Sequence, residues 1–196
     1  MREPAPAQAS DEDLASSLQA GDQAAFETLV RRHHKRVRSL CYRMTGSAAE
    51  AEDLSQETFL RVFRHRETYQ AGRRFRVWLD RICMNVCLTH QERVKRVGPV
   101  VRLGDQAHTV PASALPGGAE RQDPEARAGM NELVASVKKI TAGLPAPYRA
   151  ALVLRLFGGL SYQEIAEVLG ISMGTVMSRI NRARIRVRNA LEGRAE

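Results

Sequence analysis

Aromatic side chains are scarce in this chain, whose 196 residues include five Phe, four Tyr and one Trp. Together with a hydrophobic fraction of 43%, this shortage favours small aliphatic cores between helices over an aromatic-rich β-sandwich. Long apolar runs are also missing, since none approaches the ~18 residues that a membrane span needs. The start of the chain, MREPAPAQA, lacks the pattern of a secretory leader. We therefore expect a cytoplasmic protein.

Cysteine is rare as well, with only Cys41, Cys83 and Cys87. An odd number at unpatterned spacing argues against a disulfide framework and fits a reducing compartment. Cys83, Cys87 and His90 stand at i, i+4 and i+7, so they share one side of a helix, where a metal or redox site would be compatible with the spacing. Zinc sites usually take ligands from more than one element, so we prefer ordinary core packing for these residues. The sequence indicates no metal and no cofactor.

Positive charge is abundant and concentrated in two stretches. Lys and Arg number 30 against 22 Asp and Glu. Residues 61–102 hold 11 basic and 3 acidic side chains, and residues 175–196 hold 6 and 2, whereas the remainder is acidic to neutral. Most of the basic residues are Arg, whose planar fork fits phosphates and guanine edges, so two contacts with one nucleic acid are favoured. Two solvated helix faces are the plainer interpretation.

The helix signals predict an all-α fold with two small helical domains joined by a flexible linker. Residues 1–9 form a tail without periodicity. Residues 10–97 contain several capped helical segments and predict an N-terminal helical bundle. Pro and Gly interrupt residues 98–125, which we expect to be the linker. Helical periodicity resumes in residues 126–196. The predicted helix starts of the bundle are Ser10, Asp22, Ser47 and Arg74.

The most specific local motif lies in the C-terminal domain. Ser161 and Glu164 form a capping box, and the apolar helix that they open stops at Gly170. Ser172 then caps a longer helix, with Val176 on its inner face. This spacing is typical of a helix-turn-helix, whose second helix presents a polar, Arg-rich outer face to a DNA major groove. A structural hairpin with a solvated face is the alternative.

The helix that begins after Ser47 has an acidic outer face. No Lys or Arg occurs in residues 47–60. Carboxylates repel phosphate, so we expect this face to dock a basic helix of another protein, with an ordinary solvated face as the alternative. At helical spacing the outer face consists of Asp53, Gln56, Glu57 and Leu60.

The helix that begins near Arg74 combines an apolar side with a polar one. Phe75 and Trp78 are expected in the core. The polar side can hydrogen-bond nucleotides while the arginines that follow neutralise phosphates, and Tyr69 in the preceding loop can stack on a base drawn from the duplex. The polar and basic residues are Arg81, Asn85, Thr89, Arg93, Lys95 and Arg96.

Four motifs in this order resemble one family. They are GDQAAFETLVRRH, AEDLSQETFLRVFRH, FRVWLDRICMN and LSYQEIAEVLGISMGTVMSRINRAR. Together they resemble the extracytoplasmic-function (ECF) branch of the bacterial RNA polymerase sigma factors. The resemblance covers residues 11–97 and 126–191, so it implies sigma region 2 at 10–97 and sigma region 4 at 126–196.

The resemblance implies a non-enzymatic subunit that binds core RNA polymerase, gives it promoter choice and helps to open the duplex. The acidic face would dock on the coiled coil of the largest subunit, region 4 would meet the flap region, and an anti-sigma protein would cover these surfaces. Residues implied for the minus-ten element, read as a single strand, are Tyr69, Arg81, Asn85, Thr89, Arg93 and Arg96. Residues implied for the minus-thirty-five duplex are Arg149, Thr175, Ser178, Arg179, Asn181, Arg182 and Arg184.

Two other classes of function are weighed beside this one. A stand-alone helix-turn-helix regulator with an N-terminal sensing bundle would bind its operator without polymerase. A nucleic-acid-processing enzyme would need paired metal-binding carboxylates or a nucleophile beside a base, and the basic domains contain neither.

Overall fold

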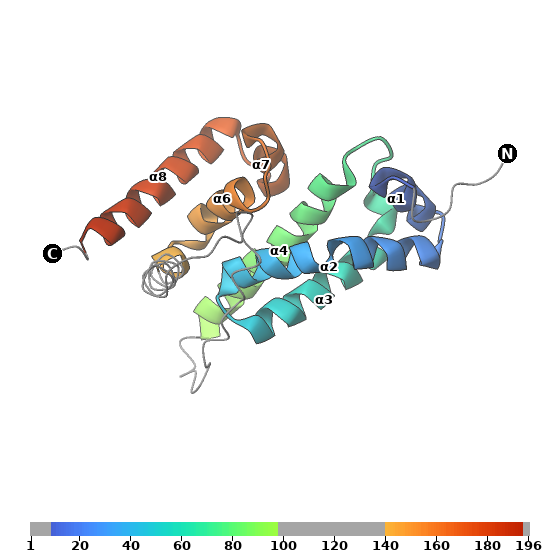
Figure 1. Cartoon of the computed structure of the whole chain (residues 1–196), viewed down its shortest axis with the longest axis horizontal. Coiled ribbons are helices and arrows are strands. Elements are labelled where there is room, and N and C mark those ends of the chain that lie inside the picture. Colours follow the sequence, from blue (N-terminus) through green and yellow to red (C-terminus); the bar gives the residue numbers. More distant parts are fainter. Residues whose placement is uncertain (1–8, 98–139, 194–196) are drawn as a thin grey trace, which may run out of the picture.

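The regular elements of the structure, a computed structural model that describes residues 9–97 and 140–193, are all helices (Figure 1). The first group contains α1 (Asp11–Gln19), α2 (Gln23–Thr45), α3 (Ala48–Arg64), the 3-10 helix η1 (Arg66–Thr68) and α4 (Phe75–Val97). The second contains α6 (Ala146–Leu156), α7 (Tyr162–Leu169) and α8 (Met173–Glu192). The prediction of an all-α fold with two helical regions is confirmed, whereas the predicted linker 98–125 lies outside the described residues. Among the described helices, none is both long and apolar enough to cross a membrane.

The helices begin and end at the capping signals of the sequence. Ser10 and Asp13 form a reciprocal capping box at the start of α1, and Asp22 accepts hydrogen bonds from two first-turn amides of α2. Gly46 ends α2 with a φ of 81°, a left-handed conformation that a residue with a Cβ adopts only at a cost. The Ser47 side chain then accepts from the Glu50 amide and starts α3.

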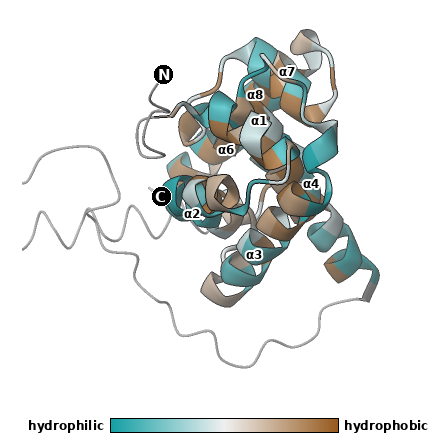
Figure 2. Cartoon of the chain, turned by 90° about the vertical axis from the view of Figure 1, so that its right-hand side faces the viewer, coloured by the Kyte–Doolittle hydropathy of each residue, from teal (hydrophilic) through white to brown (hydrophobic). Residues whose placement is uncertain are grey.

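A single apolar core fills the first group. The buried sides of α2, α3 and α4 pack against one another, and each of these helices carries both brown, hydrophobic and teal, hydrophilic segments in Figure 2. Phe75 is fully buried and Trp78 partly buried against this core, as predicted. Other fully buried members are Leu29, Val37, Ala51, Val62 and Leu79.

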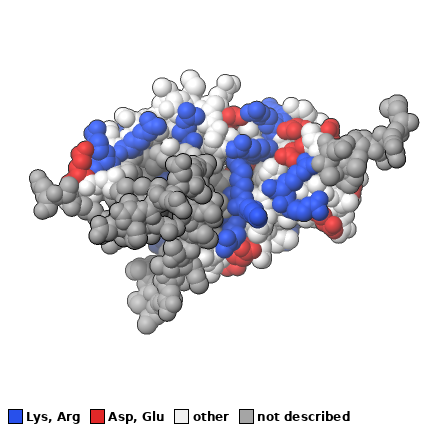
Figure 3. Space-filling model, in the orientation of Figure 1, with Lys and Arg blue, Asp and Glu red and all other residues white. Residues whose placement is uncertain are grey.

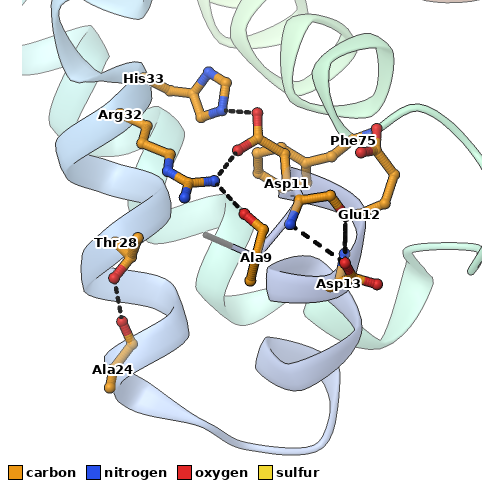
Figure 4. A network of polar contacts seen from close by, with 10 residues as sticks. Ala9, Asp11, Glu12, Asp13, Ala24, Thr28, Arg32, His33 and Phe75 are labelled. Atoms are coloured by element: carbon orange, nitrogen blue, oxygen red, sulfur yellow. Dashed lines mark hydrogen bonds and ion pairs between the residues drawn. The ribbon is translucent and has the colours of Figure 1, made fainter. Parts of the chain in front are cut away.

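Carboxylates of α1 form hydrogen bonds and ion pairs with α2 and with the start of α4 (Figure 4). Asp11 accepts a hydrogen bond from Nη1 of Arg32 at 2.8 Å, and its other oxygen lies 2.7 Å from Nε2 of His33. Glu12 accepts from the backbone amide of Phe75 at 3.2 Å. An acidic group at a helix N-terminus is electrostatically favourable, so α1 helps to fix where α4 begins.

The two groups of helices pack against each other, a point that the sequence leaves open. α7 lies against α4, and α6 lies against α2 and α4. The guanidinium of Arg43 on α2 lies 3.3 Å from the centre of the Phe157 ring, and Arg73 forms an ion pair of 2.8 Å with Glu167. Buried residues of α6, α7 and α8 belong to the same apolar cluster as the core of the first group.

Candidate protein and nucleic-acid interfaces

The acidic face predicted on α3 lies on the surface. Asp53 and Gln56 are exposed, Glu57 is partly exposed, and Leu60 stands out with 50% of its area exposed. Nε of Arg61 donates to Glu57 at 2.7 Å, which orients that carboxylate. The opposite side of the helix is buried, so the helix has two distinct faces; the buried residues include Ala51, Leu54, Thr58 and Val62.

Phe63 is a member of this surface that sequence reasoning missed. It is 42% exposed and follows Leu60 by three residues, so the two apolar side chains are neighbours along the helix. Its ring lies 5.2 Å from that of Phe26 on α2. The i, i+3 spacing after Leu60 is the signal that would have found it. The Arg66 guanidinium lies 4.9 Å from the centre of the Phe63 ring, while Glu57 precedes Leu60 by three residues. An exposed apolar pair that follows carboxylates along the helix has the composition of a docking site for a basic, partly apolar helix.

One face of α4 is polar and exposed along its length. Arg81, Asn85 and Thr89 are all exposed at successive helical turns, and Arg93 and Arg96 are exposed near the C-terminal end. This face offers hydrogen-bond donors and acceptors next to fixed positive charge, which suits an unpaired nucleotide strand.

A buried ion pair holds this helix in place. Asp80 is fully buried, and its two oxygens accept from Nη1 and Nη2 of Arg36 on α2 at 2.5 and 2.6 Å. Arg76 adds positive charge nearby, and burial together with its neighbour Arg36 lowers the pKa of Arg76. Because Asp80 and Arg81 are adjacent, the pair orients the start of the polar face.

Tyr69 is placed differently from the prediction. Its side chain is 3% exposed, its ring packs edge-on against Phe75 and Trp78, and its hydroxyl donates to the carbonyl of Arg73 at 2.5 Å. Burial raises the pKa of this tyrosine, with a contribution from the Glu12 carboxylate. In the free chain the core of the first group occupies both the ring and the hydroxyl, so stacking of Tyr69 on an unpaired base stays a prediction and requires the ring to leave this place.

The outer face of α8 carries most of the residues predicted to read duplex DNA. The capping box of α7, the left-handed Gly170 and the Ser172 cap all occur as predicted, and Val176 is buried. Blue side chains follow α8 at the upper left of Figure 3. Ser178, Asn181, Arg182 and Arg184 are exposed, whereas Thr175 and Arg179 are partly exposed.

The positive potential of this face acts on Tyr148, an α6 residue beside it. Nη1 of Arg182 donates to the Tyr148 hydroxyl at 3.4 Å. That hydrogen bond, with the charges of Arg182, Arg186 and Arg179, lowers the pKa of Tyr148. Several guanidinium groups that form no ion pair with the described residues 9–97 and 140–193 therefore converge here, as a phosphate-binding surface requires.

Arg149 does not join the α8 face. It is 9% exposed, and its guanidinium donates to the carbonyl of Met44 at the end of α2 and to the carbonyls of Ala142 and Leu144. Burial lowers its pKa. In this arrangement the guanidinium joins residues 140–156 to α2, and a contact of Arg149 with the DNA backbone stays a prediction.

The three thiols gather, whereas His90, which shares a helix side with Cys83 and Cys87, does not join them. Cys41 on α2 lies beside Cys83 and Cys87 on α4. Within the described part of the chain, these three cysteines form the one group of three or more potential metal ligands whose ligand atoms lie close together. Nε2 of His90 lies instead 3.5 Å from Oε1 of Glu50 on α3.

Comparison with known families gives two matches. The model of sigma-70 region 2 matches residues 29–97, and the model of sigma-70 region 4 matches residues 135–187. These stretches contain the α3 and α4 surfaces and the α8 surface, respectively.

Similar curated proteins cover almost the whole chain. The ECF RNA polymerase sigma factor SigE of Mycolicibacterium smegmatis is 41% identical over 93% of this chain and 69% of its own length. The RNA polymerase sigma-H factor of Pseudomonas aeruginosa is 34% identical over 94% of this chain and 95% of its own length. The ECF RNA polymerase sigma factor SigW of Bacillus subtilis is 33% identical over 89% of this chain and 92% of its own length.

Solved structures with the same fold include two complexes. CnrH, solved with the cytosolic domain of CnrY, superposes with a TM-score of 0.64 at 25% identity and covers 93% of this chain and 97% of its own. The sigma factor RpoE of Bartonella quintana, solved with the anti-sigma factor NepR, superposes with a TM-score of 0.62 at 23% identity and covers 85% of this chain and 96% of its own.

Proposed function

Because the chain belongs to the ECF family of RNA polymerase sigma factors, a non-enzymatic family that directs transcription initiation, we propose a division of that work among its three surfaces. In this proposal residues 10–97 act as region 2 and residues 126–196 as region 4. The observation that carries it is the segregation of charge: the acidic, partly apolar face lies on α3, and the basic polar faces lie on α4 and α8.

The α3 face binds core polymerase. Asp53, Gln56 and Glu57 supply polar contacts for basic side chains of the coiled coil of the largest subunit, and Leu60 with Phe63 supplies the apolar centre. Exposed apolar side chains next to charges of one sign give an interface both affinity and a preferred orientation. The exposure of Leu60 and Phe63 supports this role, because a partner that covers them removes apolar surface from water, and this stabilises the complex.

The α4 face captures the minus-ten element as a single strand. Asn85 and Thr89 hydrogen-bond base edges, and Arg81, Arg93 and Arg96 neutralise phosphates. Their common exposure along one side of a helix supports a strand that runs along α4. Tyr69 takes no part while it is packed under Trp78.

The α8 face reads the minus-thirty-five element as duplex. Arg182 and Asn181 reach base edges from the exposed side of the helix, and Thr175 and the first-turn amides of α8 meet a phosphate at the helix N-terminus. The other residues assigned to this face are Ser178, Arg179 and Arg184.

Core polymerase, promoter DNA and an anti-sigma protein are the partners in this proposal. Region 4 contacts the flap region of the polymerase, while an anti-sigma protein keeps the free chain from the polymerase. The complexes of CnrH with CnrY and of the Bartonella sigma factor with NepR support an anti-sigma partner.

Reversal of charge on the docking face tests the proposal. The double variant Gln56→Ala/Glu57→Lys is expected to lose binding to core polymerase, because it places positive charge where a basic helix docks. Binding is measured by co-purification with core polymerase, and circular dichroism checks that the helices remain. Glu27→Lys, an exposed charge reversal on α2, is the matched control and should bind as the wild type does. Undiminished binding by the double variant would refute the docking face.

A further inference from the structure

Three cysteine sulfurs meet in the core between α2 and α4, a feature that the function above does not use. Sγ of Cys41 lies 3.7 Å from Sγ of Cys83 and 3.7 Å from Sγ of Cys87, and all three sulfurs lie within 4.8 Å of one another. Each of these residues is 0% exposed. Two sulfurs come from α4, one turn apart, and the third comes from the opposing helix.

The size of this sulfur triangle fits a single metal ion at its centre. A thiolate–metal bond is about 2.3 Å long for zinc, and three such bonds in a plane place the sulfurs about 4.0 Å apart. The two separations from Cys41, both 3.7 Å, are close to that value, and the third is at most 4.8 Å. A disulfide would instead need two sulfurs at about 2.0 Å, well below the 3.7 Å found here.

The number and kind of ligands select the class of ion. Structural zinc sites take four ligands, and no fourth His, Cys, Asp or Glu joins these sulfurs among residues 9–97 and 140–193. Among the described residues the surroundings are apolar core, and the three cysteines are 0% exposed, which disfavours a water ligand. Soft thiolate sites without a fourth ligand favour a soft ion of low coordination number, of which monovalent copper is the biological example.

Hydrogen bonds between the sulfurs hold the cluster together. The S–H of Cys87 donates to the Cys41 sulfur, and Cys41 and Cys83 share a second hydrogen bond in which either sulfur can be the donor. When one monovalent ion replaces one thiol proton, the net charge of the cluster does not change.

We propose that Cys41, Cys83 and Cys87 form a binding site for one soft thiophilic ion, with monovalent copper as its class, that links α2 to α4. The proton displaced from a thiol passes to the solvent, and copper keeps its oxidation state, so no oxidant or reductant is consumed. The ion enters through local opening of the α2–α4 pair, because the closed pair leaves the sulfurs inaccessible. The polar face of α4 lies on the other side of the same helix, so a bound ion stiffens the support of that face.

Copper binding to the full-length chain tests the site without reference to transcription. The chain is purified without oxygen, incubated with monovalent copper as its bicinchoninate complex, and desalted. We expect about one copper per chain, and less than about a tenth of an equivalent of zinc in a parallel incubation with zinc chloride. X-ray absorption of the copper-loaded wild type should show only sulfur neighbours at about 2.3 Å. Nitrogen or oxygen neighbours would overturn the proposal, as would a copper content below about a tenth of an equivalent.

Two alanine variants and a matched control locate the copper. Cys41→Ala and Cys83→Ala should each lose most of the copper while circular dichroism shows an unchanged helix content. Val37→Ala, which removes a buried side chain one turn before Cys41 on the same helix, should retain it. Copper retained by both cysteine variants, or lost equally by Val37→Ala, would contradict a site at these three sulfurs.

Discussion

At the scale of single residues, Asp80 shows how one buried charge positions a functional surface. Its carboxylate is completely buried and is held at both oxygens by Arg36, which is itself 22% exposed. A buried carboxylate that loses its partner retains the cost of desolvation without the attraction that offsets it. The ion pair therefore stabilises only the arrangement in which α2 and α4 are correctly aligned.

Removal of Arg36 should destabilise the protein strongly. We expect Arg36→Met to lower the free energy of unfolding by about 3–5 kcal/mol, because Asp80 is left buried and unpaired. Arg38→Met is the matched control on the same helix, since Arg38 is half exposed and pairs with exposed Glu52, and it should cost at most about 1 kcal/mol. Denaturant unfolding followed by circular dichroism measures both. If both variants lose the same free energy of unfolding, the burial of Asp80 does not make its ion pair more important for stability than an exposed one.

Which residues face outward could be predicted from helical spacing, whereas residues with distant partners could not. The outer faces of α3, α4 and α8 follow directly from the position of apolar residues along each helix. Tyr69 lies in a loop without periodicity, so nothing local indicates that its ring packs under Trp78. Arg149 donates to a carbonyl 105 residues earlier in the chain, a partner that neither its local sequence nor the family resemblance indicates.

At the scale of helices, most boundaries could be predicted because they depend on side chains within one turn. Ser10, Asp22 and Ser161 cap their helices where the sequence places them, and the Gly46 and Gly170 stops have positive φ. The cysteine cluster is the opposite case. Two of its members are visible on one helix, but the third comes from α2, and only the packing of α2 against α4 shows that Cys41 rather than His90 completes the group.

The turn of the helix-turn-helix should depend on the backbone freedom of Gly170. Its φ is 63°, and no atom lies near the position of an added Cβ, so the cost of Gly170→Ala is conformational. We expect a loss of about 1–2 kcal/mol in the free energy of unfolding. Gly174→Ala, in the first turn of α8 and also uncrowded, should instead stabilise by up to about 0.5–1 kcal/mol. Thermal unfolding measures both, and a loss for Gly174→Ala as large as that for Gly170→Ala would contradict this reasoning.

At the scale of the whole molecule, the packed arrangement and the proposed function require different separations of the two groups of helices. Here α7 lies against α4, and the N-terminal bundle and α6–α8 share one apolar cluster. The elements at minus ten and minus thirty-five are about 25 base pairs apart, roughly 85 Å along B-form DNA. Regions in contact cannot read both elements, so we expect them to separate when the chain binds polymerase and promoter.

Energy transfer between the two groups should report this opening. Two fluorophores are attached through bio-orthogonal amino acids, one at exposed Gln70 before α4 and one at exposed Gln163 on α7. Both positions are close in sequence to the ion pairs that Arg73 and Arg74 make with α7. Transfer should be high in the free chain and lost when core polymerase and promoter DNA are added. Arg73→Glu/Arg74→Glu should lower transfer in the free chain, whereas Arg64→Glu at the end of α3 should not. Unchanged transfer in the complex would show that the contact persists.

Run-off transcription with purified core polymerase tests most directly the claim that docking and reading lie on separate surfaces. The wild type should start a specific transcript that core polymerase alone does not make, and Gln56→Ala/Glu57→Lys should make none. Arg182→Ala should still bind core polymerase but weaken recognition of the minus-thirty-five element by about 1–3 kcal/mol. A transcript from the docking variant equal to that of the wild type, or specific DNA binding by the chain alone with no transcript when core polymerase is present, would contradict the account.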